Sequence, residues 1–121
     1  MKIIKILLLA LLLVGCETMT YKQMSMNEGL EMMSKESEYI LLDVRTLEEY
    51  NGGHIPGSIC YPIEEIDEEI MDVLYDKNMT IFVYCRSGNR SKQASEKLVN
   101  LGYTHVIEIG GIIDYQGELE Y

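Results

Sequence analysis

The sequence predicts an α/β domain with a mainly parallel sheet flanked by helices. Continuous or β-rich apolar runs, typical of buried parallel strands, stand at 39–44, 80–85 and 105–111. Helical segments separate these runs at intervals that suit right-handed crossovers. The chain has 121 residues, 47% hydrophobic and 25% charged, which is the composition of one globular domain and hardly more.

The first half of the domain contributes a helix, a strand and a short helix. A helix is expected over SMNEGLEMMSKE, where Ser25 or Asn27 can cap the start. The strand YILLDV follows it. The segment TLEEYNGG then predicts a short helix that begins after Thr46 and ends at Gly52 and Gly53.

The second half alternates in the same way. HIPGSICYP predicts a turn and a brief strand, and IEEIDEEIMDVLY, residues 63–75, predicts an amphipathic helix whose acidic residues form a solvated face. The strand TIFVYC is followed by a helix that closes near Gly102 and by the strand HVIEIGG.

Acidic residues dominate the charge. The chain carries 10 Lys and Arg against 20 Asp and Glu, a net charge of −10, which argues against nucleic acid as a partner. The densest basic cluster consists of Arg86, Arg90 and Lys92, and it therefore marks a place of interest.

The first fifteen residues have the character of a secretory signal. Lys2 and Lys5 precede or border the uncharged run 6–14, which is far shorter than the roughly 18 to 20 apolar residues that span a bilayer. The tetrad LVGC, ending in Gly15 and Cys16, resembles the lipobox of bacterial lipoproteins, in which cleavage precedes a lipidated cysteine. An ordinary cleaved signal and an uncleaved anchor are the alternatives.

These features divide the chain into three parts. Residues 1–15 are expected to be a lipoprotein signal peptide, 16–22 a lipidated N-terminus and tether, and 23–121 the folded domain. Cleavage would leave 8 basic and 20 acidic residues, a net charge of −12. Acyl chains on Cys16 would then hold an extracytoplasmic protein at the membrane, and a single chain would do so weakly.

Two cysteines, Cys60 and Cys85, remain besides Cys16. They could form a disulfide in an oxidising compartment, but two free thiols are favoured. Cys60 lies in the apolar run SICYP, which suggests a buried strand and a packing role.

Cys85 stands where a strand ends and a helix begins, in VYCRSGNRS. The first amides of a helix have no internal partners, and the helix dipole adds about half a positive charge there. Gly88 allows the loop amides to form a nest for an anion, and Arg86 and Arg90 add full charges. Each effect favours thiolate over thiol. The alternative is a cysteine that merely ends a buried strand.

Loop length separates two chemistries. Protein tyrosine phosphatases use a C-x5-R loop, whereas Cys85 to Arg90 is C-x4-R, a tighter ring that suits the terminal sulfur of a persulfide. With LLDVRTLEEYNGGHIPGSICYP, YCRSGNRS and GGIIDY in this order, the chain from about Tyr21 to Tyr121 resembles a single-domain rhodanese, a sulfurtransferase. A phosphatase or arsenate reductase is the less favoured enzyme.

The resemblance implies a rhodanese-like three-layer domain and a mechanism without a cofactor. Cys85 would attack the outer sulfur of thiosulfate or a similar small anionic donor, and the resulting persulfide would pass its sulfur to cyanide or a thiol, including that of a protein. Loop amides would stabilise the charge on sulfur. The expected substrate-binding residues are Arg86, Ser87, Gly88, Asn89, Arg90 and Ser91, although Ser91 can equally cap the helix.

Four polar residues before this loop are assigned to the scaffold. By the resemblance, Asp43, Arg45, Glu49 and His54 brace the active loop rather than take part in catalysis. A thiolate already stabilised by its loop needs no base, and GHIPG also reads as a turn that satisfies the imidazole locally. The histidines and cysteines are too scattered for a metal site.

The chain departs from the family at its end. Tyr115 stands where members commonly have Trp, and it can fill a similar apolar slot with less area. Any helix after it is expected to be short or absent. A persulfide carrier or partner-binding module without turnover is the non-enzymatic alternative.

Overall fold

The structure, a computed structural model, describes residues 20–121. Its elements, in chain order, are β1 (Lys22–Gln23), α2 (Met26–Lys35), β2 (Ile40–Asp43), α3 (Leu47–Asn51), β3 (Ile59–Cys60), the 3-10 helices η1 (Ile63–Glu65) and η2 (Glu68–Asp72), β4 (Thr80–Cys85), α4 (Asn89–Asn100), β5 (His105–Gly111) and the 3-10 helix η3 (Ile112–Asp114).

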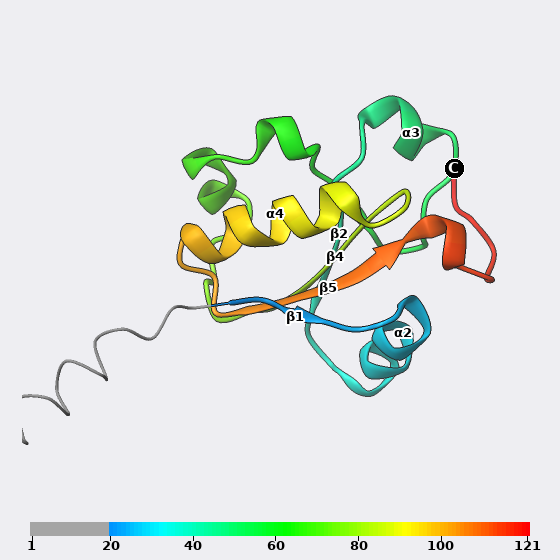
Figure 1. Ribbon diagram of the computed structural model, residues 1–121, viewed down its shortest axis with the longest axis horizontal. Coiled ribbons are helices and arrows are strands. Elements are labelled where there is room, and N and C mark those ends of the chain that lie inside the picture. The colour runs from blue at the N-terminus through cyan, green and yellow to red at the C-terminus, as the bar shows by residue number, and fades with distance from the viewer. Residues whose placement is uncertain (1–19) are drawn as a thin grey trace, which may run out of the picture.

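The strands of residues 20–121 form one parallel sheet in the order β1-β5-β4-β2-β3. Figure 1 shows α2 on one side of this sheet and α4 with η1 and η2 on the other. The predicted α/β fold with a parallel sheet between helices is confirmed. Since β4 is the central strand, its carboxyl end lies in the middle of the edge where ligands of such sheets bind.

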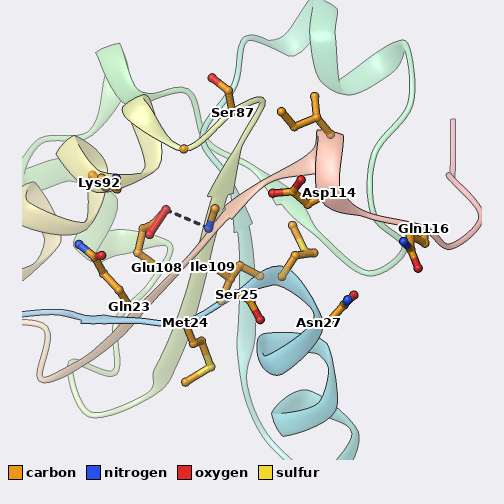
Figure 2. Close-up of a pocket in the computed structure, with 14 residues that line it drawn as sticks. Gln23, Met24, Ser25, Asn27, Ser87, Lys92, Glu108, Ile109, Asp114 and Gln116 are labelled. Carbon is orange, nitrogen blue, oxygen red and sulfur yellow. Dashed lines mark hydrogen bonds between the residues drawn. The ribbon is translucent and has the colours of Figure 1, made fainter.

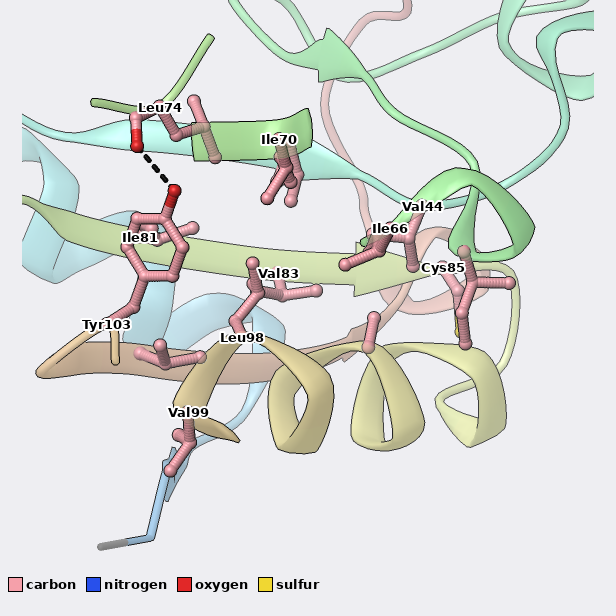
Figure 3. Close-up of a cluster of buried hydrophobic side chains, with 14 residues drawn as sticks. Val44, Ile66, Ile70, Leu74, Ile81, Val83, Cys85, Leu98, Val99 and Tyr103 are labelled. Carbon is pink, nitrogen blue, oxygen red and sulfur yellow. Dashed lines mark hydrogen bonds between the residues drawn. The ribbon is translucent and has the colours of Figure 1, made fainter. Parts of the chain in front are cut away.

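Alternation along β4 divides the core between the two faces. Phe82 and Tyr84 point toward α2, whereas Ile81, Val83 and Cys85 point toward α4. Figure 3 shows the cluster on the α4 face, with Cys85 at the end where β4 stops. The core packing therefore directs the sulfur of Cys85 toward the start of α4.

The predicted helix over residues 63–75 is wrong in form. The segment makes η1 and η2, and between them Ile66 has extended backbone and Asp67 caps the Glu69 N–H with its carboxylate at 2.9 Å. The apolar spacing was nevertheless a good guide to burial. Of the residues that it placed inside, Met71 is half-buried and the others are buried: Ile63, Ile66, Ile70 and Leu74.

Like charges explain why no continuous helix forms here. An α-helix over this segment would place Glu64 beside Glu68 and Glu65 beside Glu69, at i,i+4 spacing, where equal charges destabilise a helix. The 3-10 turns and the extended residue between them avoid both alignments and still bury the isoleucines.

The two edge strands differ from expectation. β1 was not predicted, and Lys22, counted with the tether, is its first residue. β3 is an edge strand of two residues in which Ile59 is exposed and Cys60 half-buried, so the fully buried strand expected around Cys60 is wrong.

Two predicted helix starts are confirmed. Ser25 caps α2 and Thr46 caps α3, and each forms a reciprocal capping box with the glutamate three residues on, Glu28 and Glu49. Of the two candidates for the first cap, Ser25 and not Asn27 takes the position.

Several expectations fall on residues outside the described range. They are the signal peptide, the tetrad LVGC that ends in Cys16, and the lipid on that residue. These expectations, and the extracytoplasmic location that depends on them, stay predictions. Among the helices of residues 20–121, none has the length and hydropathy needed to cross a bilayer.

Candidate active site

Cys85 is the last residue of β4 and is held beside a bulge in β5. Val83 pairs with Glu108 but Cys85 pairs with Gly111, so β5 has one extra residue opposite Tyr84. Gly110, within the bulge, has a φ of +85°, which favours glycine. A bulge bends the strand that contains it, and this one brings the Gly-Gly segment against the loop that follows Cys85.

Gly111 allows the closest approach between these segments. A Cβ built on Gly111 would lie 2.1 Å from the carbonyl oxygen of Arg86, which no side chain could tolerate. The same carbonyl accepts a hydrogen bond from the Ile113 N–H at 3.2 Å. The Gly-Gly segment therefore supports the loop that follows Cys85 through backbone contacts.

The sulfur of Cys85 receives a hydrogen bond from the loop. The Gly88 N–H donates to Sγ at 3.0 Å, and the Ser91 hydroxyl lies 3.4 Å from Sγ. Gly88 is the N-cap of α4, with a φ of +112° that only glycine adopts without strain. A donor aimed at sulfur at the start of a helix stabilises negative charge on that sulfur.

The loop residues divide between surface and interior. Arg86, Ser87 and Asn89 are exposed around the loop, while Cys85 is only 1% exposed and Ser91 is buried. Ser91 lies inside α4 rather than at its cap, so the capping alternative is wrong. Of the six residues expected to bind substrate, Arg86, Ser87 and Gly88 form the loop, and Asn89, Arg90 and Ser91 form the first turn of α4.

Arg90 is bound to the scaffold. Its two terminal nitrogens donate to the two carboxylate oxygens of Glu49 at 2.7 and 2.9 Å. The hydrogen bonds that Arg90 donates to Glu49 lower the pKa of Glu49 to about 2 and raise the pKa of Arg90. This bidentate pair joins α3 to the first turn of α4 and thereby fixes the loop that leads from Cys85 into α4.

The Glu49 ion pair predicts an acid-dependent loss of stability. Because the folded pKa of about 2 lies below the ordinary 4.5, the pair stabilises the fold above about pH 4.5 and its contribution disappears as pH falls toward 2. Glu49→Gln is expected to lower the free energy of unfolding by about 1 kcal/mol near neutral pH, since both side chains are partly exposed. Urea unfolding at a series of pH values measures the difference.

Its control is Glu48→Gln, which removes an exposed carboxylate from the same helix. The difference in free energy of unfolding between wild type and Glu49→Gln should disappear at acid pH. The smaller difference between wild type and Glu48→Gln should not show this dependence on pH. A gap for Glu49→Gln that is unchanged near pH 2 contradicts the assigned role of the pair.

Asp43 and Arg45 form a buried ion pair beside Tyr84 rather than against the loop that follows Cys85. The Arg45 Nη2 donates to Asp43 Oδ2 at 2.7 Å and to the Gly53 carbonyl at 2.8 Å, and Asp43 is fully buried. Burial opposes the charge of Arg45, but the hydrogen bonds and charge of Asp43 raise its pKa above the ordinary value. The guanidinium also lies over the ring of Tyr84, 5.9 Å from the centroid.

His54 is satisfied away from the sulfur. Its ring stacks on Tyr50 with centroids 3.7 Å apart, and its Nδ1 hydrogen-bonds with the Tyr50 carbonyl at 2.9 Å. Its backbone pairs with Glu120 in an isolated antiparallel bridge. The imidazole is thus satisfied locally, as expected, but its partner Tyr50 belongs to α3 and not to the turn GHIPG.

Cys60 and Cys85 are free and point to opposite faces of the sheet. Cys60 is in register with Asp43, and Asp43 with Tyr84, whose side chain points toward α2, whereas Cys85 points toward α4. The free thiols favoured over a disulfide are confirmed. Burial and the nearby Asp43 carboxylate raise the pKa of Cys60, which makes it less reactive than an ordinary cysteine thiol.

Tyr115 is half-buried against the cluster on the α2 face, and its hydroxyl donates to the Glu118 carbonyl at 3.0 Å. It occupies an apolar position as expected.

Sequence reasoning missed Glu108. This residue of β5 is 3% exposed, and its carboxylate Oε1 accepts hydrogen bonds from the Ser91 hydroxyl at 2.7 Å and the Gly110 N–H at 2.9 Å. Glu108 lines a cavity of about 690 Å³ together with the loop residues Ser87 and Gly88. Figure 2 shows Glu108 and Ser87 among the residues around this cavity. The available signal was a single charge in the apolar run HVIEIGG.

Comparisons with known proteins agree with this geometry. The profile of the family described as Rhodanese-like domain matches residues 25–118. The chain is 45% identical over 73 residues to the thiosulfate sulfurtransferase PspE of Escherichia coli, covering 60% of this chain and 70% of that one. It is 31% identical to the thiosulfate sulfurtransferase GlpE of Pseudoalteromonas translucida, covering 77% and 86%.

Longer relatives and solved structures also match. The putative sulfur carrier protein YrkF of Bacillus subtilis is 29% identical, over 81% of this chain and 52% of its own, so this chain spans about half of it. A structure described as rhodanese with anions from E. coli is 40% identical with a TM-score of 0.63, covering 68% and 96%. A rhodanese-like domain from Anabaena is 29% identical with a TM-score of 0.75, covering 84% and 80%.

Proposed function

Since the chain belongs to the rhodanese-like domain family of sulfurtransferases, we propose that Cys85 takes sulfane sulfur from thiosulfate and passes it to cyanide or a thiol. The observation that carries the proposal is the hydrogen bond from the Gly88 N–H to Sγ, at the end of β4 and the start of α4. It gives the sulfur a fixed donor for the negative charge that it bears as a nucleophile and again as a persulfide.

Each half of the cycle is a substitution at sulfur. The Cys85 thiolate attacks the outer sulfur of thiosulfate, a bond between two sulfur atoms forms, and sulfite leaves with the electron pair of the broken bond. A cyanide or thiolate acceptor then attacks the outer sulfur of the Cys85 persulfide and the Cys85 thiolate leaves. The exposed guanidinium of Arg86, next in the chain, is suited to attract an anionic donor.

Two names among the relatives support the donor. PspE and GlpE are both described as thiosulfate sulfurtransferases, and one similar solved structure is described as containing anions. The positive charge of Arg90 lies close enough to interact with Cys85, but the ion pair with Glu49 offsets much of its attraction for an anionic donor, which leaves that role chiefly to Arg86.

A sulfur carrier without turnover is the second candidate, because the relative YrkF is described as a putative sulfur carrier protein. Both functions require the persulfide, so loading alone does not separate them.

The test is loading followed by turnover. The purified full chain is incubated with thiosulfate and desalted, and its intact mass is expected to rise by one sulfur atom that cyanide then removes. Sustained thiocyanate formation beyond one equivalent identifies the enzyme, whereas thiocyanate release that stops after one equivalent identifies the carrier. A chain that never gains sulfur contradicts both.

A further inference from the structure

Glu108 is connected to the reactive sulfur through one hydroxyl. Ser91 Oγ lies 2.7 Å from Glu108 Oε1 and 3.4 Å from Cys85 Sγ, and all three residues are buried. Val106 and Glu108 point toward the α4 face of β5, which places the carboxylate against Ser91 in the first turn of α4. Figure 2 shows the Glu108 side chain between this turn and Gln23.

The hydrogen atoms at this point are too few for independent ionisation. The hydroxyl of Ser91 carries one hydrogen, and around it lie the Glu108 carboxylate, the Gly88 carbonyl at 2.9 Å and the sulfur. While Cys85 is a thiol, it can donate to Ser91 and Ser91 to Glu108. As a thiolate, Cys85 keeps the hydrogen bond from the Gly88 N–H and can accept a second one from Ser91. When Ser91 turns its hydrogen toward sulfur in this way, Glu108 keeps a hydrogen bond to Ser91 only by carrying a proton itself.

The charged surroundings of this chain of contacts come from four elements. The loop and α4 contribute basic groups, α3 contributes the carboxylate that binds Arg90, and the segment after β5 contributes an acid. The residues of β1 and α2 that line the cavity are uncharged. The charged groups are Arg86, Arg90, Lys92, Glu49 and Asp114, and the uncharged polar ones are Gln23, Ser25 and Asn27. Among residues 20–121 no basic group forms an ion pair with Glu108.

We propose that Glu108 holds the proton of the Cys85 thiol, transferred through Ser91. The S–H bond breaks and its proton passes to Ser91 Oγ, while the hydrogen of Ser91 passes to the Glu108 carboxylate. One negative charge moves from carboxylate to sulfur and no proton leaves the protein. Glu108 is thus a positioning residue that acts on sulfur through Ser91, and its role deepens the proposed sulfur transfer by saying where the proton goes.

The proton transfer predicts an unusual pH profile. If the proton stays inside the protein, the fraction of reactive sulfur does not depend on external pH over a wide range. The full chain is alkylated with iodoacetamide, and the mass of the peptide that contains Cys85 reports the extent of reaction. The alkylation rate of Cys85 is expected to change less than about threefold between roughly pH 6 and 8. In Glu108→Gln the proton must go to solvent, so the rate should rise about tenfold per pH unit.

Glu108→Gln preserves the hydrogen bonds, since its amide oxygen can accept from Ser91 and from the Gly110 N–H. Ser91→Ala breaks the connection in its middle and should show the same steep profile. Asp114→Asn removes a carboxylate from the same cavity without contact to Ser91, so its profile should stay flat.

A flat profile in Glu108→Gln or in Ser91→Ala overturns the proposal. So does a steep profile in wild type or in Asp114→Asn, because the latter would make the effect one of general charge. Alkylation needs no sulfur donor, so this result is independent of whether thiosulfate loads the chain.

Discussion

Cys85→Ser is expected to abolish both sulfur loading and thiocyanate formation, a loss of at least about 10³-fold in kcat. The hydroxyl of serine occupies nearly the same place beneath the Gly88 N–H, so the loop should persist. It does not ionise near neutral pH, and it cannot form a persulfide. Thiocyanate release from thiosulfate and cyanide measures turnover, and intact mass measures loading.

Its control is Cys60→Ser, the same chemical change at the other described free thiol. Cys60 lies on the opposite face of the sheet and its pKa is raised by burial, so this variant should load and turn over like wild type. Activity that survives Cys85→Ser, or that disappears in Cys60→Ser while the fold is retained, means that the reactive sulfur has been assigned to the wrong residue.

Asp43→Ala should produce the largest loss of stability, about 3–5 kcal/mol in the free energy of unfolding. It leaves the guanidinium of Arg45, which is 5% exposed, without its carboxylate in the interior. Domains of this size have roughly 5–15 kcal/mol in total, so the variant should be close to unfolding at 25 °C. Urea or thermal unfolding followed by circular dichroism gives the value.

Two comparisons isolate the cause. Asp72→Ala removes an exposed aspartate and should change stability by less than about 0.5 kcal/mol. Asp43→Leu combined with Arg45→Met removes both charges and should be less destabilising than Asp43→Ala alone. If the double variant is the less stable of the two, the cost arises from packing rather than from an unpaired charge.

Much of the fold was predictable because its signals are local. The apolar runs at 80–85 and 105–111 form strands of a sheet whose two faces are covered by helices. Ser25 and Thr46 cap helices, each paired in a capping box with the glutamate three residues later. The prediction of a helix over 63–75 was wrong for an equally local reason. It rested on the apolar spacing and did not take account of the like charges that would align on the polar face of such a helix.

The candidate site was predictable as a place but not as a set of contacts. The order of strand, cysteine, Gly88 and helix identifies the loop, because the start of a helix offers unpaired amides whatever surrounds it. Which charges meet there depends on segments far apart in the chain. Arg90 finds Glu49 across 41 residues, and Ser91 finds Glu108 across 17.

The sequence alone therefore determined the parallel α/β architecture and the position of Cys85 at the end of a strand, since both follow from periodicity and from the backbone of neighbouring residues. Only the tertiary structure decided that Arg90 is held by α3, that the bulge presses Gly111 against the Arg86 carbonyl, and that Glu108 lies one hydroxyl away from the sulfur. These contacts depend on the register of β4 against β5 and on how the helices pack over it, and no local pattern encodes that register.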